Sequence, residues 1–368
     1  MSDSCLTLPR VRRKVKKLGL MIRLAFLDGQ EPTYVGHCFS ASGLHLTSPP
    51  VVTACPILFG IRPFLLSLYR PRFSDEVPAA YGRGPNLVSR EQQGSSVMVS
   101  RTLRFATFLA PNMFPVYAFI ARYVQVRLGI PTELIVGSSY ERLSEQADVS
   151  FLCGLAYIEL RRLGEPIEPL AAPLLRGGRY GGRPVYFSDV IVHRDSPFRS
   201  FADLRGCSWA YNEPYSHSGP GITCHRLVEL NETQDYFGQV IQAGWHQQSI
   251  RLVQAGEVDA SAVDSHVLAL ARRDHPELDI SLRVIDSLGP STIQPVVAAS
   301  WLEERLKADL RSILLELTAD ATGRTVLADR LVERFVAIAD EDYDDLRRMR
   351  TACIAAGLPT LRPRGVAC

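Results

Sequence analysis

From residue 102 onward, stretches of strand length alternate with stretches that have the period of an amphipathic helix. Residues 103–108 have the apolar alternation of a half-buried strand, and residues 114–128 repeat apolar side chains at helical spacing. Residues 132–136 predict the next strand. Strands separated by helices pair in parallel, so this order predicts an α/β protein whose sheets are parallel and doubly wound.

The alternation runs through two series that are joined by extended segments. Residues 184–192 and 291–299 are extended and predict two crossings between lobes. We therefore expect lobe 1 to begin in residues 101–186, lobe 2 to span 187–290, and residues 291–368 to return, complete lobe 1 and add C-terminal helices. Further strands are predicted at 147–152, 167–175, 208–211, 240–244, 257–263 and 282–286, and further helices at 155–163, 201–206, 266–273, 301–317 and 341–356.

Residues 1–100 differ in character from the rest and are expected to be poorly ordered or a non-family N-terminal extension. Six basic side chains within residues 10–17 precede an apolar stretch, which is the order found in signal peptides. Arg23 interrupts that stretch and no small-residue cleavage site follows, so the export signal is not convincing. Residues 51–69 are apolar but are broken by proline, glycine and arginine, which disfavours a membrane span. One hypothesis places the natural start near Met98.

Composition excludes two classes of function. The net charge is +2, and without the basic cluster the chain is close to neutral or slightly acidic, which argues against a nucleic-acid partner. The eight cysteines form no CxxC pair and have no metal-ligand spacing, so we expect neither a metal nor a cofactor. With 368 residues, of which 46% are hydrophobic, the chain can hold two domains or one two-lobed domain with an extension.

Residues 208–221 combine a strand, a turn rich in hydroxyl groups and glycine, and the start of a helix. A proline just inside a helix start is favoured because its missing N–H would be unpaired there, so Pro220 predicts an N-cap at Ser218 or Gly219. The N–H groups of such a helix end, together with the hydroxyls of Ser216 and Ser218, suit an anion. An ordinary capped helix explains the same residues, and both interpretations stay open.

Other polar side chains lie at predicted strand ends or helix starts, where ligands bind in α/β folds. His246 begins one predicted helix, and Asp264 ends a predicted strand. An imidazolium would attract an oxyanion, whereas Asp264 would accept a hydrogen bond from a protonated P–OH or from a ligand amine. Tyr140 and Tyr157 follow strands of the first series. Each residue also has a simpler explanation, because the first two can cap helices and the tyrosines can pack in a core.

Catalytic motifs are weak in this chain. Ser216-His217-Ser218 has the residue types of a nucleophile and a base, but sequence neighbours seldom face each other, and the glycines of a nucleophile elbow are missing. The glycine-rich turn at 177–182 lacks the P-loop lysine, and the sequence has neither an HExxH nor a Rossmann motif. We therefore expect no catalytic residues. One alternative is a metal site made by His217, Cys224, His225 and His246.

Short motifs between residues 103 and 358 occur in a characteristic order. Their order and spacing resemble those of the substrate-binding proteins of ABC transporters for phosphate, phosphite and phosphonate, which have the type II periplasmic-binding fold. The motifs are Gly137-Ser138-Ser139-Tyr140, Asp148 with Cys153-Gly154 and Tyr157, residues 182–189, residues 200–206, Trp209-Ala210-Tyr211-Asn212, Ser216-x-Ser218-Gly219, Gly244-x-His246-x-x-Ser249-Ile250 and residues 258–265.

The resemblance implies two α/β lobes, joined by crossing strands, that close on a small oxyanion. Pro220 departs from a fully open anion-binding turn because it removes one N–H. By the resemblance, the anion would be held by Ser216, His217, Ser218 and Gly219, and the pocket completed by Tyr140, Tyr157, His246 and Asp264.

The expected function is therefore capture of phosphate, phosphite or phosphonate for an ABC transporter permease. The resemblance also implies a periplasmic or membrane-associated exterior location, and we expect a monomer without enzymatic activity. Two alternatives on the same fold are a ligand sensor outside transport and an enzyme acting on a small phosphorylated or pyrimidine-like ligand, because a fold does not determine function.

Overall fold

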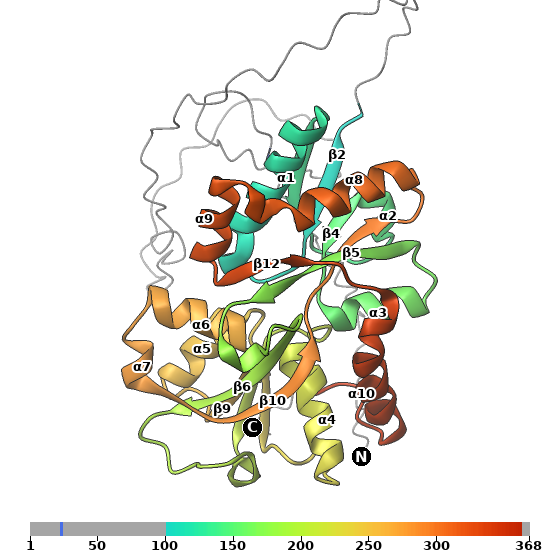
Figure 1. Ribbon diagram of the computed structural model, residues 1–368. Coiled ribbons are helices and arrows are strands. Elements are labelled where there is room, and N and C mark those ends of the chain that lie inside the picture. The colour runs from blue at the N-terminus through green and yellow to red at the C-terminus, as the bar shows by residue number, and fades with distance from the viewer. Residues whose placement is uncertain (1–22, 25–100, 363–368) are drawn as a thin grey trace, which may run out of the picture. The chain divides into compact units, whose positions relative to one another are not determined.

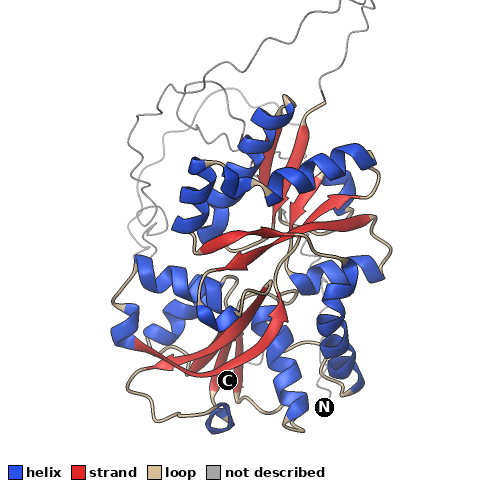
Figure 2. Cartoon of the chain, viewed as in Figure 1, coloured by secondary structure: helices blue, strands red, loops and turns tan. Residues whose placement is uncertain are grey.

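The computed structural model describes residues 23–24 and 101–362, which form two β-sheets flanked by helices (Figures 1 and 2). The expectations for residues 1–100, including a start near Met98, lie outside the described residues except at β1 (Arg23–Leu24), which pairs antiparallel with β3 (Thr132–Val136). In the described part of the chain, no helix is long and apolar enough to span a membrane.

The first sheet and its covering helices form lobe 1. Its strand order is β1-β3-β2-β4-β11-β5-β12, with β2 (Leu103–Thr107), β4 (Val149–Phe151), β11 (Val296–Ala299), β5 (Ile167–Leu175) and β12 (Val332–Val336). β2 pairs parallel with β3 and β4, whereas β11 and β12 pair antiparallel with their neighbours. The sheet is therefore mixed, with parallel pairing confined to β3, β2 and β4.

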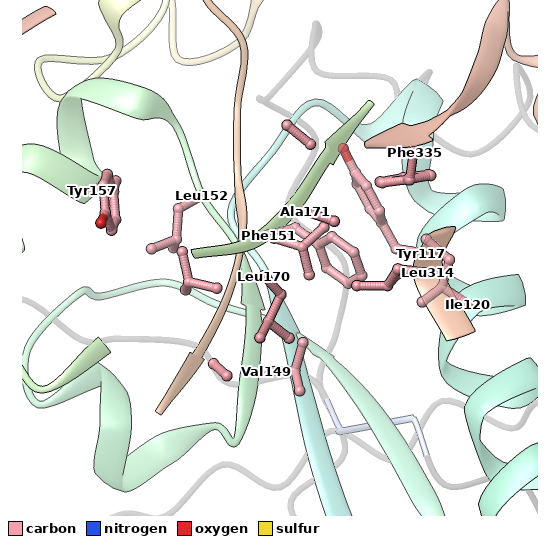
Figure 3. Packing of buried hydrophobic residues seen from close by; sticks show 14 of the residues in the cluster. Tyr117, Ile120, Val149, Phe151, Leu152, Tyr157, Leu170, Ala171, Leu314 and Phe335 are labelled. Atoms are coloured by element: carbon pink, nitrogen blue, oxygen red, sulfur yellow. The ribbon is translucent and has the colours of Figure 1, made fainter. Parts of the chain in front are cut away.

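Helix α1 (Phe114–Leu128) packs its apolar face on this sheet. Tyr117 of the helix stacks on Phe151 of β4 with ring centroids 4.2 Å apart, and Figure 3 shows Ile120 on the same face of the helix. Burial of side chains of this size stabilises the fold by roughly 1.5–3 kcal/mol each. The other helices of lobe 1 are α2 (Leu143–Gln146), α3 (Gly154–Arg162), α8 (Glu304–Leu315) and α9 (Ala321–Asp329), whereas α10 (Asp344–Ala355) packs against elements of both lobes.

The second sheet forms lobe 2. Its strand order is β10-β6-β9-β7-β8, with β10 (Leu282–Thr292), β6 (Val185–His193), β9 (Ala260–Asp264), β7 (Ser208–Tyr211) and β8 (Gln239–Gln242). β7 pairs parallel with β8 and β9, whereas β6 pairs antiparallel with β9 and β10. The helices of lobe 2 are α4 (Ile222–Glu229), α5 (His246–Gln254), α6 (Ser265–Asp274) and α7 (Leu278–Ser281).

Two segments carry the chain between the sheets. Residues 176–184 connect β5 to β6, and residues 293–295 connect β10 to β11. The two crossings touch, because the N–H of Ile293 donates to the carbonyl oxygen of Pro184 over 2.9 Å. On another side of the molecule, α10 packs against α3 of lobe 1 and α4 of lobe 2. The two lobes are thus connected both at the crossings and through α10.

This architecture confirms the predicted α/β class with crossing strands. Helix 114–128 and the strands at 132–136, 167–175 and 208–211 have the predicted bounds. The expectation of wholly parallel sheets is wrong, because each strand that follows a crossing enters its sheet antiparallel to a neighbour. Helix α9 and strand β12 were not predicted, because they are short and follow each other closely after α8.

Candidate ligand-binding site

The hydroxyl-rich turn after β7 is a single π-helical turn, His217–Gly221, that leads into α4. Its N-cap is Ser216, whose Oγ accepts a hydrogen bond from the N–H of Gly219 at 3.4 Å. The predicted N-cap at Ser218 or Gly219 is therefore wrong, since the wider turn begins two residues earlier and takes Pro220 inside it. Gly219 is required by space, because a Cβ there would lie 2.2 Å from Asn212 Oδ1.

Ser218 connects this turn to the start of α5. Its Oγ lies 2.7 Å from His246 Nε2 and 3.2 Å from Ser216 Oγ. The other ring nitrogen of His246, Nδ1, is buried and has no hydrogen-bond partner in the structure. Burial lowers the pKa of His246 to about 4, although the nearby Asp264 carboxylate opposes the shift. The imidazole is therefore neutral at pH 7 and has a nitrogen available for another group.

Asp264 stands at the end of β9, where it caps α6. Its Oδ1 accepts hydrogen bonds from the N–H groups of His266 (2.8 Å) and Val267 (3.3 Å), while Oδ2 accepts one from Gln294 Nε2 (2.7 Å). Gln294 belongs to the second crossing. Asp264 is thus a helix cap that also connects lobe 2 to the hinge region.

A cavity of about 70 Å³ lies between the lobes, and its lining includes Ser216, Ser218, His246, Asp264 and Gln294. None of the described residues that line it is lysine or arginine, and its ionisable side chains are Glu213, Asp264, His246, His266, Tyr117 and Cys153. Two groups make up most of the wall. Lobe 2 contributes Asn212, Glu213, Ser216, Ser218, Trp245, His246, Asp264, His266 and Val267, and lobe 1 contributes Phe108, Leu109, Ala110, Met113, Tyr117, Phe151, Cys153, Pro173, Val296 and Phe335.

Four of the eight predicted site residues line this cavity: Ser216, Ser218, His246 and Asp264. A fifth, Tyr140, lies beside it. Its ring stacks on Phe108 with centroids 4.6 Å apart, and its hydroxyl is buried without a hydrogen-bond partner. Burial raises the pKa of Tyr140, and the Glu213 carboxylate adds to the shift, so the hydroxyl stays protonated and can donate.

The other three predicted residues do not line the cavity. His217 turns away, since its Nε2 pairs with Ser291 Oγ at 2.9 Å and its backbone N–H donates to Cys153 Sγ at 3.2 Å. Gly219 faces Asn212 and shapes the turn. The Tyr157 hydroxyl donates to Asp340, and Figure 3 shows its ring well apart from Tyr117 and Phe151.

Sequence reasoning missed several wall residues. Glu213 lies between β7 and the hydroxyl-rich turn. Its carboxyl group has no hydrogen-bond partner among the described residues, and burial raises its pKa to about 7. Tyr117 belongs to the apolar face of a predicted helix, and Phe335 lies in β12, which was not predicted. Gln294 lies in the extended segment 291–299, which was predicted as a crossing and not as part of the site. No pattern in the sequence identifies these residues as a group, because each of them lines the cavity only through packing between distant elements.

Among the described residues, no group of three or more His, Cys, Asp or Glu side chains could hold a metal ion. The alternative site made by His217, Cys224, His225 and His246 therefore has no support in that part of the chain. His217 and His246 are directed to different partners, Ser291 and Ser218.

Two α/β lobes, two crossing segments and a cavity lined by both lobes define a solute-binding protein of the hinged type. The family model for the periplasmic substrate-binding proteins of ABC phosphonate transporters matches residues 106–343, and the chain belongs to this family. The family consists of transporter substrate-binding proteins rather than enzymes, which confirms the expectation of no catalysis and the main prediction of function.

Solved structures agree with this fold. A binding-protein component of an ABC phosphonate transporter from Pseudomonas aeruginosa has a TM-score of 0.62 at 18% identity, covering 70% of this chain and 88% of that one. PhnD1 from Prochlorococcus marinus, solved with methylphosphonate, has a TM-score of 0.61 at 16% identity, covering 68% and 97%. A Xanthomonas citri protein bound to ATP has a TM-score of 0.54 at 16% identity, covering 70% and 98%. At these identities the likeness concerns the fold.

Proposed function

We propose that the cavity between the lobes captures a small phosphorus oxyanion, namely a phosphate, phosphite or phosphonate. The observation that carries this proposal is the convergence of helix starts on the lobe 2 side of the cavity. Ser216 and Ser218 lie at the turn that begins α4, and His246 is the first residue of α5. Helix N-termini carry a partial positive charge and favour anions.

Hydroxyl and imidazole groups then supply the hydrogen bonds. Ser216 and Ser218 donate to the anion oxygens, and His246 turns its unpaired Nδ1 or its Nε2 toward them. None of the described residues that line the cavity is lysine or arginine, so charge is compensated by helix ends and by proton uptake on His246 when the anion arrives. Asp264 and Glu213 favour a ligand that still carries a proton, since a carboxylate can only accept a hydrogen bond.

Capture by this site would proceed through hinge closure. In this proposal lobe 1 comprises residues 101–186 together with 291–368, and lobe 2 comprises residues 187–290. Ligand contacts to both lobes stabilise the closed form, which delivers the oxyanion to the permease of an ABC transporter. The protein would act as a monomer in the periplasm or at the membrane exterior, without a nucleic-acid partner. Tyr140 would contribute at the rim, while His217, Gly219 and Tyr157 would support the site through packing.

Isothermal titration with phosphate, phosphite and methylphosphonate tests the proposal. At least one ligand should bind more tightly than about 1 mM, which corresponds to about −4 kcal/mol. Ser218→Ala should weaken that binding by about 1–3 kcal/mol, because a buried oxygen of the ligand loses its donor. Ser261→Ala is the matched control, since Ser261 is equally buried in β9 but does not line the cavity. Binding weaker than 1 mM for all three ligands would contradict the proposal.

A further inference from the structure

The cavity between the lobes contains two carboxyl groups whose surroundings differ. Asp264 accepts three hydrogen bonds, two from backbone N–H groups of α6 and one from Gln294 Nε2. Glu213 follows β7 and also lines the cavity, but its carboxyl group has no hydrogen-bond partner among the described residues. Hydrogen-bond donors favour the charged form of a carboxyl group, whereas burial without donors favours the neutral form. Of the two groups, Glu213 is the one whose surroundings favour the neutral acid.

The lobe 2 side of the cavity supplies no positive charge to Glu213. Neither lysine nor arginine occurs among the described residues that line it, and Asp264 has the same sign of charge as Glu213. Burial lowers the pKa of His246 to about 4 and that of His266 below its ordinary value, so both lining histidines are neutral at pH 7. Burial without a cation raises the pKa of Glu213 to about 7, and both of its forms are therefore populated in the free protein at pH 7.

The groups that face Glu213 from lobe 1 are also uncharged. The Tyr140 hydroxyl is buried without a hydrogen-bond partner, and burial raises its pKa. Burial likewise raises the pKa of Cys153 to about 11, and the Glu213 carboxylate adds to both shifts. The pKa of Tyr117, on the far side of the cavity, is raised by burial as well. All three groups stay protonated at pH 7, so none of them compensates a charge on Glu213.

An arriving oxyanion changes the balance between the two forms of Glu213. Its negative charge repels the Glu213 carboxylate across a cavity of only about 70 Å³, where little water separates and screens the two charges. As a carboxylate, Glu213 could only accept a hydrogen bond, whereas the neutral acid donates one to an anion oxygen. Hydrogen bonds from a neutral acid to an anion are charge-assisted and strong. The complex therefore favours the protonated side chain more than the free protein does.

We propose that capture of the oxyanion is coupled to the uptake of one proton by Glu213, so that affinity is high in acidic and neutral medium and falls as the medium becomes alkaline. The inference rests on the proposed function and adds a regulation of the same site. Glu213 takes this proton from solvent and donates a hydrogen bond with it to a ligand oxygen. By linkage, a proton that the complex holds and the free protein lacks lowers the affinity by up to about ten-fold for each pH unit.

Titration calorimetry of the full chain in two buffers of different ionisation enthalpy counts the protons taken up on binding. The ligand is the tightest binder among phosphate, phosphite and methylphosphonate. Glu213→Gln keeps the size of the neutral acid and an N–H donor in its place, but it cannot titrate. At pH 8 the unaltered chain should take up about one proton more than the variant, whereas at pH 5.5, where Glu213 is already protonated, the two should take up about equal numbers.

The affinities give a second readout of the same coupling. Because the variant does not have to bind a proton at this position, it should bind the ligand about ten-fold more tightly than the unaltered chain at pH 8 and within about two-fold of it at pH 5.5. Protons bound by His246 and by the ligand in solution are common to both proteins. Glu257→Gln is the matched control, since Glu257 pairs with Arg251 outside the cavity, and it should behave as the unaltered chain does.

Equal proton uptake by the unaltered chain and Glu213→Gln at pH 8, or weaker binding by that variant at pH 8, overturns the inference alone. Binding of none of the three ligands by the unaltered chain at either pH overturns the proposed function as well. Infrared difference spectra of the unaltered chain decide the matter even if Glu213→Gln does not fold. Addition of ligand at pH 8 should produce the C=O band of a protonated carboxyl group, and the absence of that band would contradict the inference.

Discussion

The His246 imidazole is buried, and its pKa is lowered to about 4 from the ordinary 6.5 because the charged form loses hydration. In the unfolded chain the same group takes up its proton near pH 6.5. The unfolded state therefore binds more protons between pH 6.5 and 4, and acid favours unfolding. His246 contributes stability that is fully present above pH 6.5 and is lost as the pH falls toward 4.

This reasoning gives a prediction for His246→Gln, which cannot be protonated. The free energy of unfolding of the unaltered protein should fall by about 3 kcal/mol more than that of the variant between pH 7 and pH 4. Urea denaturation at pH 7, 5.5 and 4 measures the difference. The other buried groups near the site, including His217 and Glu213, are present in both proteins, so their contributions cancel. If the free energy of unfolding had the same pH dependence in both proteins, His246 would have the same pKa in the folded and the unfolded state, which would contradict the prediction.

At the scale of elements, the turn His217–Gly221 positions the lobe 2 wall. Asn212, at the end of β7, leaves no space for a side chain at position 219, because a Cβ there would approach within 2.2 Å of its Oδ1. Asn212 is itself buried, with protein atoms packed around it. The geometry of the turn therefore depends on the contact between Gly219 and Asn212.

Gly219→Ala should displace the turn, lower the free energy of unfolding by about 1–3 kcal/mol and weaken oxyanion binding. Gly178→Ala is the control, since a Cβ there meets no atom within 4 Å, and its stability should stay within about 0.5 kcal/mol of the original. Thermal denaturation and calorimetry of both variants provide the comparison. A stable Gly219→Ala protein with unchanged affinity would show that the turn adapts.

The elements with clear periodicity were predictable from sequence. Helix α1 and strands β3, β5 and β7 have the predicted bounds, because runs of apolar residues there are long enough to define a period. The N-cap at Ser216 was not predictable from the sequence, since a π-helical turn places Pro220 inside the turn rather than at its first position. Strand β12, which supplies Phe335, was missed because its pairing with β5 depends on tertiary contacts.

The site was predictable to the extent that chain order determines strand ends. Ser216, Ser218, His246 and Asp264 line one cavity because β7, β8 and β9 present their ends to the same edge of a sheet. The lobe 1 side of the cavity was not predictable in this way. Residues such as Tyr117 and Phe151 have the pattern of any core position, and only the approach of lobe 2 turns them into a binding surface.

At the scale of the whole molecule, the hinge and the site share residues. Gln294 of the second crossing donates to Asp264, which caps α6 and lines the cavity. The crossings bond to each other through Ile293 and Pro184. A ligand that binds the lobe 2 wall therefore lies next to the segment that must bend when the lobes move, and its contacts with both walls favour the closed form.

The most direct test of this account is a crystal structure of the full chain with methylphosphonate. We expect the ligand between the lobes, with phosphonyl oxygens within about 3.2 Å of Ser218 Oγ and a nitrogen of His246, a normal hydrogen-bond distance. The methyl group should face Met113, Tyr117, Phe151 and Phe335. Ligand bound elsewhere, or bound in this cavity with its oxygens against those four side chains, would contradict the account.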